Sequence, residues 1–304
     1  MKSSSVISAS LAAITLLAAN PAFADDHAQT AATTLPSGPE GPALWKVTDD
    51  DTTIYLFGTV HALDPSVQWY DAEIDAALQS SGTIVTEILM DPQSEAAMQQ
   101  LALSQGVFTD GTTLRSLLDA DQLTTYEAAL GGMGVPAGAF DQLEPWMAGL
   151  TLTFLPLMQQ GYDLQAGVDK VILSKSGGKP VDALETAEFQ LGIFDGLPID
   201  KQVEFMMAAV EGIDEIKVML DAMVAEWLAG DAEGLAEIMN EGLEDETLAS
   251  ALLYERNANW AEWIDTRMDE PGTVFIAVGA GHLAGDKSVQ DYLAERGIAT
   301  DRIQ

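Results

Sequence analysis

The chain of 304 residues contains no cysteine. Disulfide bonds, thiolate metal ligands and a cysteine nucleophile are therefore excluded. Lys and Arg are also scarce, with 13 of them against 48 Asp and Glu, so the formal net charge is −35. A surface this acidic repels phosphate groups, which makes nucleic acid and anionic membranes poor partners. The charge favours solubility and does not by itself indicate a function.

Long apolar runs are missing as well. After residue 24, no apolar run approaches the roughly 18 residues of a transmembrane helix, so we expect no membrane span. Residues 1–24 have the pattern of a secretory signal peptide, with Lys2 near the start, an apolar stretch over residues 6–19 and a small-x-small signal at residues 22–24. We therefore expect export and, in a Gram-negative cell, a periplasmic location. Residues 25–42 are polar and predict a flexible linker.

The remainder, residues 43–304, is predicted to form a single α/β domain. β-branched and aromatic runs predict strands over residues 43–47, 52–57, 83–85, 179–184, 273–278 and 298–303. Apolar residues at helical spacing predict helices over residues 69–78 and 289–296 and through two middle regions, about 94–174 and 200–267. The expected fold class is a central mixed, largely parallel β-sheet flanked by helices, with a large helical middle region.

Only three histidines occur, and the two within the predicted domain share one sequence context. Each lies three residues after a glycine that ends a predicted strand, in Gly58-Thr59-Val60-His61 and in Gly279-Ala280-Gly281-His282. Glycine at the carboxyl end of a strand permits a sharp turn, and the residues after it face the crevice where open α/β sheets bind ligands. We therefore expect His61 and His282 to meet in one site. The alternative is a pair of ordinary histidines whose ring nitrogens bind backbone carbonyls.

Two carboxylates and one guanidinium are further candidates for this site. Glu87 and Glu185 each follow a short predicted strand. Two imidazoles and a carboxylate are a common ligand set for a catalytic divalent metal, and Glu87 can supply the carboxylate. Glu185 would then be free to act as a general base, and Arg256 could bind a substrate carboxylate or stabilise an oxyanion. The alternatives are helix capping or a cation partner for Glu87, helix capping for Glu185, and a structural ion pair with one of these glutamates for Arg256.

These residues also carry a family resemblance. Nearly the whole predicted domain resembles the TraB/GumN family, which is similar to the Tiki proteases. The resemblance is carried by Trp45, Ile54–His61, Thr83–Glu87, Gly178–Val181, Leu184–Thr186, Arg256-Asn257 and Gly279–Leu283. It implies a fold like that of the erythromycin esterase and ChaN group. It also implies metal-dependent peptide hydrolysis by His61, His282 and Glu87, while Glu185 and Arg256 match further family positions.

Three functions follow from these observations. The leading hypothesis is an exported, peptidase-like metallohydrolase that uses manganese, cobalt, zinc or iron and acts on a peptide or small-molecule substrate. The second keeps the fold without the metal, with a histidine as general base beside Glu87 or Glu185. The third is a non-enzymatic periplasmic protein that binds a peptide signal, haem or an intermediate of polysaccharide export.

Overall fold

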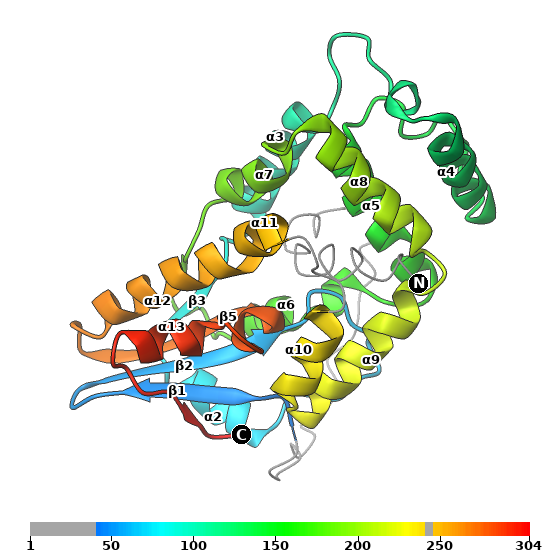
Figure 1. Cartoon of the computed structure of the whole chain (residues 1–304). Coiled ribbons are helices and arrows are strands. Elements are labelled where there is room, and N and C mark those ends of the chain that lie inside the picture. Colours follow the sequence, from blue (N-terminus) through cyan, green and yellow to red (C-terminus); the bar gives the residue numbers. More distant parts are fainter. Residues whose placement is uncertain (1–40, 241–245) are drawn as a thin grey trace.

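The computed structural model describes residues 41–240 and 246–304. The signal peptide expected over residues 1–24 and nearly all of the linker expected over residues 25–42 lie outside the described residues. The described part is built around a six-stranded sheet, with helices on both of its faces and a group of helices above it (Figure 1).

The strand order of the sheet is β4-β3-β5-β2-β1-β6. The strands are β1 (Leu44–Thr48), β2 (Thr52–Thr59), β3 (Thr83–Thr86), β4 (Val181–Ala183), β5 (Gly272–Gly279) and β6 (Asp301–Arg302). The pairs β2·β5, β5·β3 and β3·β4 are parallel, whereas β1 is antiparallel to both β2 and β6. The predicted mixed, largely parallel sheet is therefore confirmed.

The helices occupy the regions between these strands. The α-helices are α2 (Ala72–Ser80), α3 (Pro92–Gln105), α4 (Ala120–Gly132), α5 (Pro145–Gln159), α6 (Val168–Ser174), α7 (Ala187–Asp195), α8 (Ile199–Glu211), α9 (Ile216–Ala229), α10 (Ala232–Asn240), α11 (Glu246–Ala249), α12 (Glu255–Arg267) and α13 (Val289–Glu295). Shorter 3-10 segments are η2 (Leu114–Leu117), η3 (Leu164–Ala166) and η5 (Ala280–Leu283), and η4 (Ser250–Tyr254) is a π-helical turn. The large helical middle region expected from the sequence is present.

The hairpin of β1 and β2 is closed by a side chain. The Oδ1 atom of Asp49 accepts hydrogen bonds from the backbone N–H groups of Asp51 and Thr52, at 3.0 and 2.7 Å. This local bonding reverses the chain. Val47 then pairs with Ile54, and the two strands run back antiparallel.

Alternating side chains give the sheet two apolar faces. Phe57 and Phe275 pack with residues of α2, α6 and α9 on one face. Leu56 and Ile276 pack with residues of α12 and α13 on the other. Figure 1 shows α12 and α13 on one side of β2 and α2 on its other side. The central strands are thus buried on both faces, as is usual for parallel strands covered by helices.

Helices α3, α4, α5, α7 and α8 form two further apolar cores above the sheet (Figure 1). In one core the rings of Trp146 and Phe194 stack with centroids 6.4 Å apart, and Phe205 lies 5.4 Å from Phe194. In the other, Tyr126 and Met206 are fully buried. This helical region is therefore held by its own packing and does not depend on the sheet alone.

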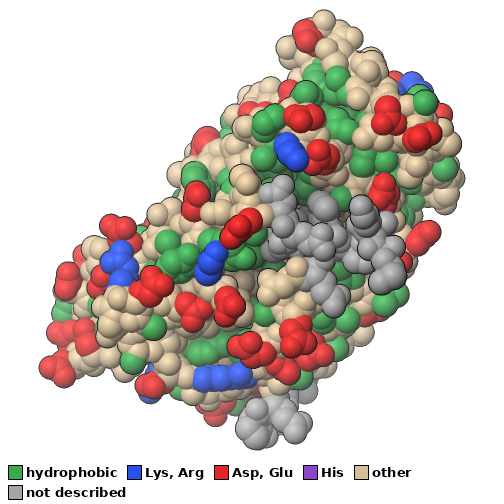
Figure 2. All heavy atoms as spheres, in the orientation of Figure 1, with side chains coloured by type: hydrophobic (Ala, Val, Ile, Leu, Met, Phe, Trp, Pro, Cys, Tyr) green, Lys and Arg blue, Asp and Glu red, His purple; other side chains and the backbone are tan. Residues whose placement is uncertain are grey.

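Several predicted elements differ from the structure at their ends, and β4, expected over residues 179–184, has only three residues. Helix α2 begins at Ala72 rather than at residue 69, because the Asp71 side chain caps it by accepting from the N–H groups of Glu73 and Ile74. The last strand, β6, has only two residues. Within the described residues, we find no helix with the length and apolar character that a membrane crossing requires. Figure 2 shows carboxylates over both the sheet part and the helical part of the face it draws, with few Lys or Arg between them.

Candidate active site

The two Gly-x-x-His motifs lie side by side because β2 and β5 are neighbours in the sheet. In this parallel pair Thr59 lies opposite Gly279, so both strands end at the same edge. Gly58 permits a close approach, since a β carbon there would lie 2.9 Å from an α carbon of the segment that follows β5. His61 and His282 are both buried, with exposed fractions of 7% and 1%. The structure thus brings together the two histidines that the sequence singles out.

Asp169 in α6 orients the ring of His61. Its Oδ1 atom lies 3.1 Å from Nδ1 of His61, and both side chains are buried. A carboxylate can only accept, so Nδ1 carries a proton and Nε2 holds the free lone pair of the neutral ring. Burial opposes the charged form of the ring, but the carboxylate of Asp169 outweighs burial, and the pKa of His61 is raised above its ordinary value. The partner of Nδ1 is therefore a side chain and not a backbone carbonyl.

Arg256 and Asn257 at the start of α12 hold His282. Nη1 of Arg256 donates to Nε2 of His282 at 3.1 Å, and Nδ1 of His282 lies 2.6 Å from Oδ1 of Asn257. The amide of Asn257 is itself fixed, because its Nδ2 donates to the carbonyl oxygen of Lys287. A guanidinium only donates, so the ring of His282 is neutral and its proton is on Nδ1. Burial and the charge of Arg256 lower the pKa of His282 to about 3.

All three nitrogens of the Arg256 guanidinium bind groups of the protein. Nε donates to Glu185 at 2.9 Å, and Nη2 lies 2.6 Å from Oε2 of Glu87 and 2.9 Å from Oε2 of Glu185. Nη1 donates to the carbonyl oxygen of Leu252, in the π-helical turn η4, and to His282. A guanidinium has five N–H groups, and four of them donate hydrogen bonds here, while the contact of Nη2 with Glu185 is an ion pair. The sequence allows two roles for Arg256, a structural ion pair or substrate binding. The geometry is that of a buried ion pair.

Glu87 follows β3 and reaches the centre of the site. Its Oε1 accepts from the backbone N–H of Gly279 at 2.7 Å, and its Oε2 accepts from Nε2 of Gln190 at 3.0 Å as well as from Arg256. Burial alone would raise the pKa of this carboxyl group. The charge of Arg256 reverses the effect and holds the pKa well below its ordinary value. Glu87 is therefore a buried, ionised link between β5 and α12.

Glu185 follows β4 and binds the same guanidinium. Nε1 of Trp260 donates to its Oε1 at 2.9 Å, and Nε2 of Gln190 donates to its Oε2 at 2.9 Å. The N-cap of α7 is Thr186, whose side chain accepts from the N–H of Phe189. Thr186, and not Glu185, therefore caps α7, so the helix-capping alternative for Glu185 does not apply.

This arrangement does not fit the predicted metal site. Each histidine is oriented by a side-chain oxygen, from Asp169 or Asn257, and this is typical of metal ligands. An N–H of Arg256, however, occupies the lone pair on Nε2 of His282, and the same guanidinium binds Oε2 of Glu87. A metal bound by these two groups would also lie beside a fixed positive charge. Within residues 41–240 and 246–304, no group of three or more His, Asp or Glu side chains is arranged to hold a metal ion.

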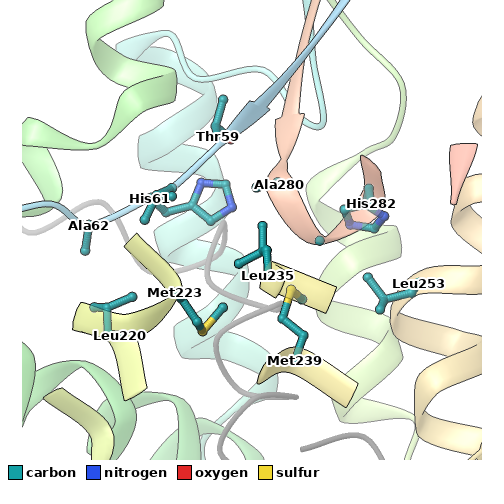
Figure 3. A pocket seen from close by; sticks show the side chains of 13 residues that line it. Thr59, His61, Ala62, Leu220, Met223, Leu235, Met239, Leu253, Ala280 and His282 are labelled. Carbon is teal, nitrogen blue, oxygen red and sulfur yellow. The ribbon is translucent and has the colours of Figure 1, made fainter. Parts of the chain in front are cut away.

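An apolar pocket lies beside the two histidines (Figure 3). The strand ends, η5, α9, α10 and η4 line it, and its empty space is about 570 Å3, open solvent included. Figure 3 shows His61 and His282 on the strand-end side of the pocket, with Met223 of α9 and Met239 of α10 opposite them. A ligand in this pocket would contact the imidazoles on one side and apolar helix side chains on the other.

Gly279 leaves space between the charged and aromatic side chains of the site. A β carbon at this position would lie 3.1 Å from Oε1 of Glu87, 3.5 Å from Cδ2 of His282 and 3.6 Å from Nε2 of His61. A water molecule near this position would have a carboxylate oxygen and an imidazole nitrogen within reach. The backbone of Gly279 is ordinary, with φ −49° and ψ 132°, so the absence of a side chain matters here for space and not for conformation.

The sequence did not single out Asp169 or Gln190 as site residues. Both are polar side chains on the buried face of a helix, since Asp169 lies three residues before the buried Ile172 and Gln190 lies four before the buried Phe194. A polar residue at an apolar helical position is the signal that could reveal them. Asn257 belongs to the family resemblance without an assigned role, and the structure shows that it orients His282.

No curated protein and no solved structure matches the chain. A family model, the TraB/PrgY/gumN family, matches residues 43–302. The match spans all five site residues expected from the sequence, from His61 at one end to His282 at the other. The resemblance seen in the sequence is confirmed, and the chain belongs to the TraB/PrgY/gumN family.

Proposed function

We propose that the chain is a hydrolase in which His61, oriented by Asp169, acts as general base on a water molecule without a metal ion. One observation carries the proposal: Nδ1 of His61 is bound to a buried carboxylate at 3.1 Å, which leaves Nε2 as the basic atom of a residue that lines the pocket. A carboxylate that fixes the tautomer of a histidine and stabilises its charged form is the arrangement that general bases use. The opposite pKa shifts of His61 and His282 support a division of roles between them.

In this proposal the attacking water lies beside Gly279, between Glu87 and His61. Nε2 of His61 takes a proton from the water as the water oxygen attacks the carbonyl carbon of the substrate. His61 returns the proton to the leaving group when the bond from the carbonyl carbon to oxygen or nitrogen breaks. The products are a carboxylic acid and an alcohol or amine, so atoms and charge balance.

Arg256 and its partners act here as positioning residues. Their hydrogen bonds hold Glu87 against the N–H of Gly279 and keep His282 neutral. The ring of His282 is also fixed by Trp260, with centroids 4.3 Å apart. Because the hydrogen bonds of Arg256 are directed to groups of the protein, its contribution is to place Glu87 and not to bind the substrate.

The proposal includes export, with the hydrolase acting on a peptide or small-molecule carbonyl compound outside the cytoplasm. The leader pattern of residues 1–24 supports this location. A binding or accessory role is the competing function, and it predicts stoichiometric binding without turnover.

The space beside Gly279 gives the sharpest test. Gly279→Ala would place one carbon where the water is proposed to lie, and the φ and ψ of this residue are open to alanine. We expect kcat/KM for carbonyl esters, amides or peptides to fall by roughly 10²–10⁴, with an unchanged circular dichroism spectrum. The matched control is Gly82→Ala, whose β carbon would meet nothing closer than 3.7 Å.

Two further variants separate the general base from other functions. His61→Gln and Asp169→Asn should each lower kcat far more than they change KM, because both act on the transfer of the proton. Full activity in these variants would overturn the proposal. Activity that a chelator abolishes would instead favour the metallohydrolase, and saturable binding without turnover would favour the binding protein.

A further inference from the structure

The pocket beside His61 has an apolar wall made by flexible side chains. Leu220 and Met223 of α9, Leu235 and Met239 of α10, and Leu253 of η4 face the two strand ends. Methionine has an unbranched, adaptable side chain that follows the shape of a hydrocarbon ligand. A wall of this kind removes apolar surface from water without imposing one ligand shape.

The pocket offers few hydrogen-bond partners. Both ring nitrogens of His282 and Nδ1 of His61 already bind protein groups. Among the pocket-lining side chains that the structure describes, Nε2 of His61 and the buried hydroxyl of Thr59 are the polar atoms without a protein partner. An extended peptide would bring several amide groups into this space, and each one buried without a partner costs free energy. A hydrocarbon chain with a single carbonyl group has no such cost.

The charges around the pocket disfavour a charged ligand. No Lys, Arg, Asp or Glu is among the described residues that line it. An ammonium group would lose its water there without gaining a paired charge. The nearest ionised acid, Glu87, would also repel an anion, so a free fatty acid fits less well than its neutral ester.

We infer that the substrate of this site is a neutral ester with an apolar acyl chain, and that the pocket binds this chain beside His61. The inference rests on the proposed function. Water attacks the ester carbonyl, a bond from the water oxygen to the carbonyl carbon forms, and the bond from that carbon to the alkoxy oxygen breaks. The proton that His61 removes from the water passes to the leaving alcohol, and the other product is the free acid. The acid is then an anion beside Glu87, which favours its release.

A series of p-nitrophenyl esters from acetyl to decanoyl tests the inference on the protein as it is exported. We expect kcat/KM to rise about fourfold with each added methylene until the pocket is filled, which corresponds to about 0.8 kcal/mol per buried methylene. Met223→Trp should fill part of the pocket and weaken the preference for long chains, lowering the ratio of octanoyl to acetyl activity at least tenfold. The matched control is Met158→Trp on α5, where the side chain is 47% exposed and the ratio should not change.

A binding measurement keeps this inference separate from the proposed function. Methyl n-alkyl ketones carry the same chain and carbonyl group but cannot be hydrolysed, so calorimetry with butanone to decanone reports binding alone. Affinity that rises with chain length, and that Met223→Trp removes, supports the acyl pocket even if no ester is hydrolysed, and in that case the hydrolase proposal fails. Hydrolysis without any dependence on chain length overturns the inference and leaves the hydrolase. The absence of both binding and hydrolysis overturns both.

Discussion

A β carbon on Gly167 would overlap the carbonyl oxygen of His61. Gly167 is the N-cap of α6, and the next residue, Val168, donates its N–H to the carbonyl oxygen of Val60 at 2.9 Å. The helix that carries Asp169 is therefore pressed against the strand end that carries His61. Such a close approach of two backbones requires a residue without a side chain.

Gly167→Ala should therefore separate Asp169 from His61. We expect a loss of about 1–3 kcal/mol in the free energy of unfolding from overpacking, and a fall in kcat/KM of up to about a hundredfold from the misplaced base. Urea denaturation and ester kinetics measure the two effects. Gly192→Ala in α7 is the control, because a β carbon there meets nothing within 4 Å, and it should stabilise the helix by about 0.5–1 kcal/mol. Wild-type kinetics in Gly167→Ala would show that this contact does not position the base.

Arg256→Met should destabilise the fold strongly. It leaves the carboxylates of Glu87 and Glu185 buried without their cation, and breaking a buried ion pair in this way costs about 3–5 kcal/mol. Arg296→Met removes a partly exposed ion pair with Glu262 and Asp265 and should cost about 0–1 kcal/mol. Both are measured by urea denaturation. Equal losses in the two variants would contradict the central role of the Arg256 network.

Acid should destabilise the protein through His282. The unfolded chain protonates this histidine near its ordinary pKa of about 6.5, whereas in the folded state its pKa is about 3. The unfolded state therefore binds more protons as the pH falls from about 6.5 to about 5, and the free energy of unfolding should fall by about 1.4 kcal/mol per pH unit. Near pH ~6.5 His61 opposes this trend, because its raised pKa makes the folded state bind more of this proton than the unfolded state does. Below a pH of about 5.5 it is protonated in both states, and the full effect of His282 remains.

Urea denaturation at stepped pH tests this linkage, with His282→Gln as the comparison. The glutamine variant lacks the titrating ring, so its stability should change less between pH ~6.5 and ~5. Identical pH slopes for the two proteins would mean that His282 is not held neutral in the fold.

Chelators should leave hydrolysis unchanged, because Arg256 occupies the acceptor atoms of His282 and Glu87 that a metal would need. Mass spectrometry of the native protein, after exchange against manganese, cobalt, zinc and iron, should find much less than one metal per chain. The comparison is the folded double variant His61→Ala, His282→Ala. Stoichiometric metal that is lost in the double variant would reinstate the metallohydrolase.

Export predicts a defined amino terminus. Cleavage after the small-x-small signal would leave Asp25 as the first residue of the mature chain. Mass spectrometry of the protein from the extracytoplasmic fraction measures this directly. Ala24→Arg should block cleavage and leave the longer chain in the membrane fraction, while Ala31→Arg in the expected linker should not. Retention of the uncleaved wild-type chain in the cytoplasm would contradict the expectation.

The sequence predicts the parts of this protein that have local causes. The Asp49 turn, the buried run of β5 and the glycines that end β2 and β5 each leave a pattern within a few residues. Because these two strands pair in parallel, the sequence also predicts that His61 and His282 lie close together. The bonds of Arg256 do not follow from the sequence, because their acceptors come from four separate places in the chain. Asp169 is one of 48 acidic residues, and only its place on a buried helix face distinguishes it in the sequence. The sequence therefore does not predict its bond to His61.

The position of β5 has a consequence for the order in which the candidate site is assembled. This strand enters the sheet between β3 and β2, although it is made after nearly all of the other described elements. A growing chain that ends before residue 272 lacks the central strand, the N–H that binds Glu87 and the second histidine. Long loops must close before these contacts form, which makes the assembly of the sheet's centre a late and slow event. A chain that has not yet added β5 therefore lacks the candidate site, which is complete only when the last part of the chain has folded.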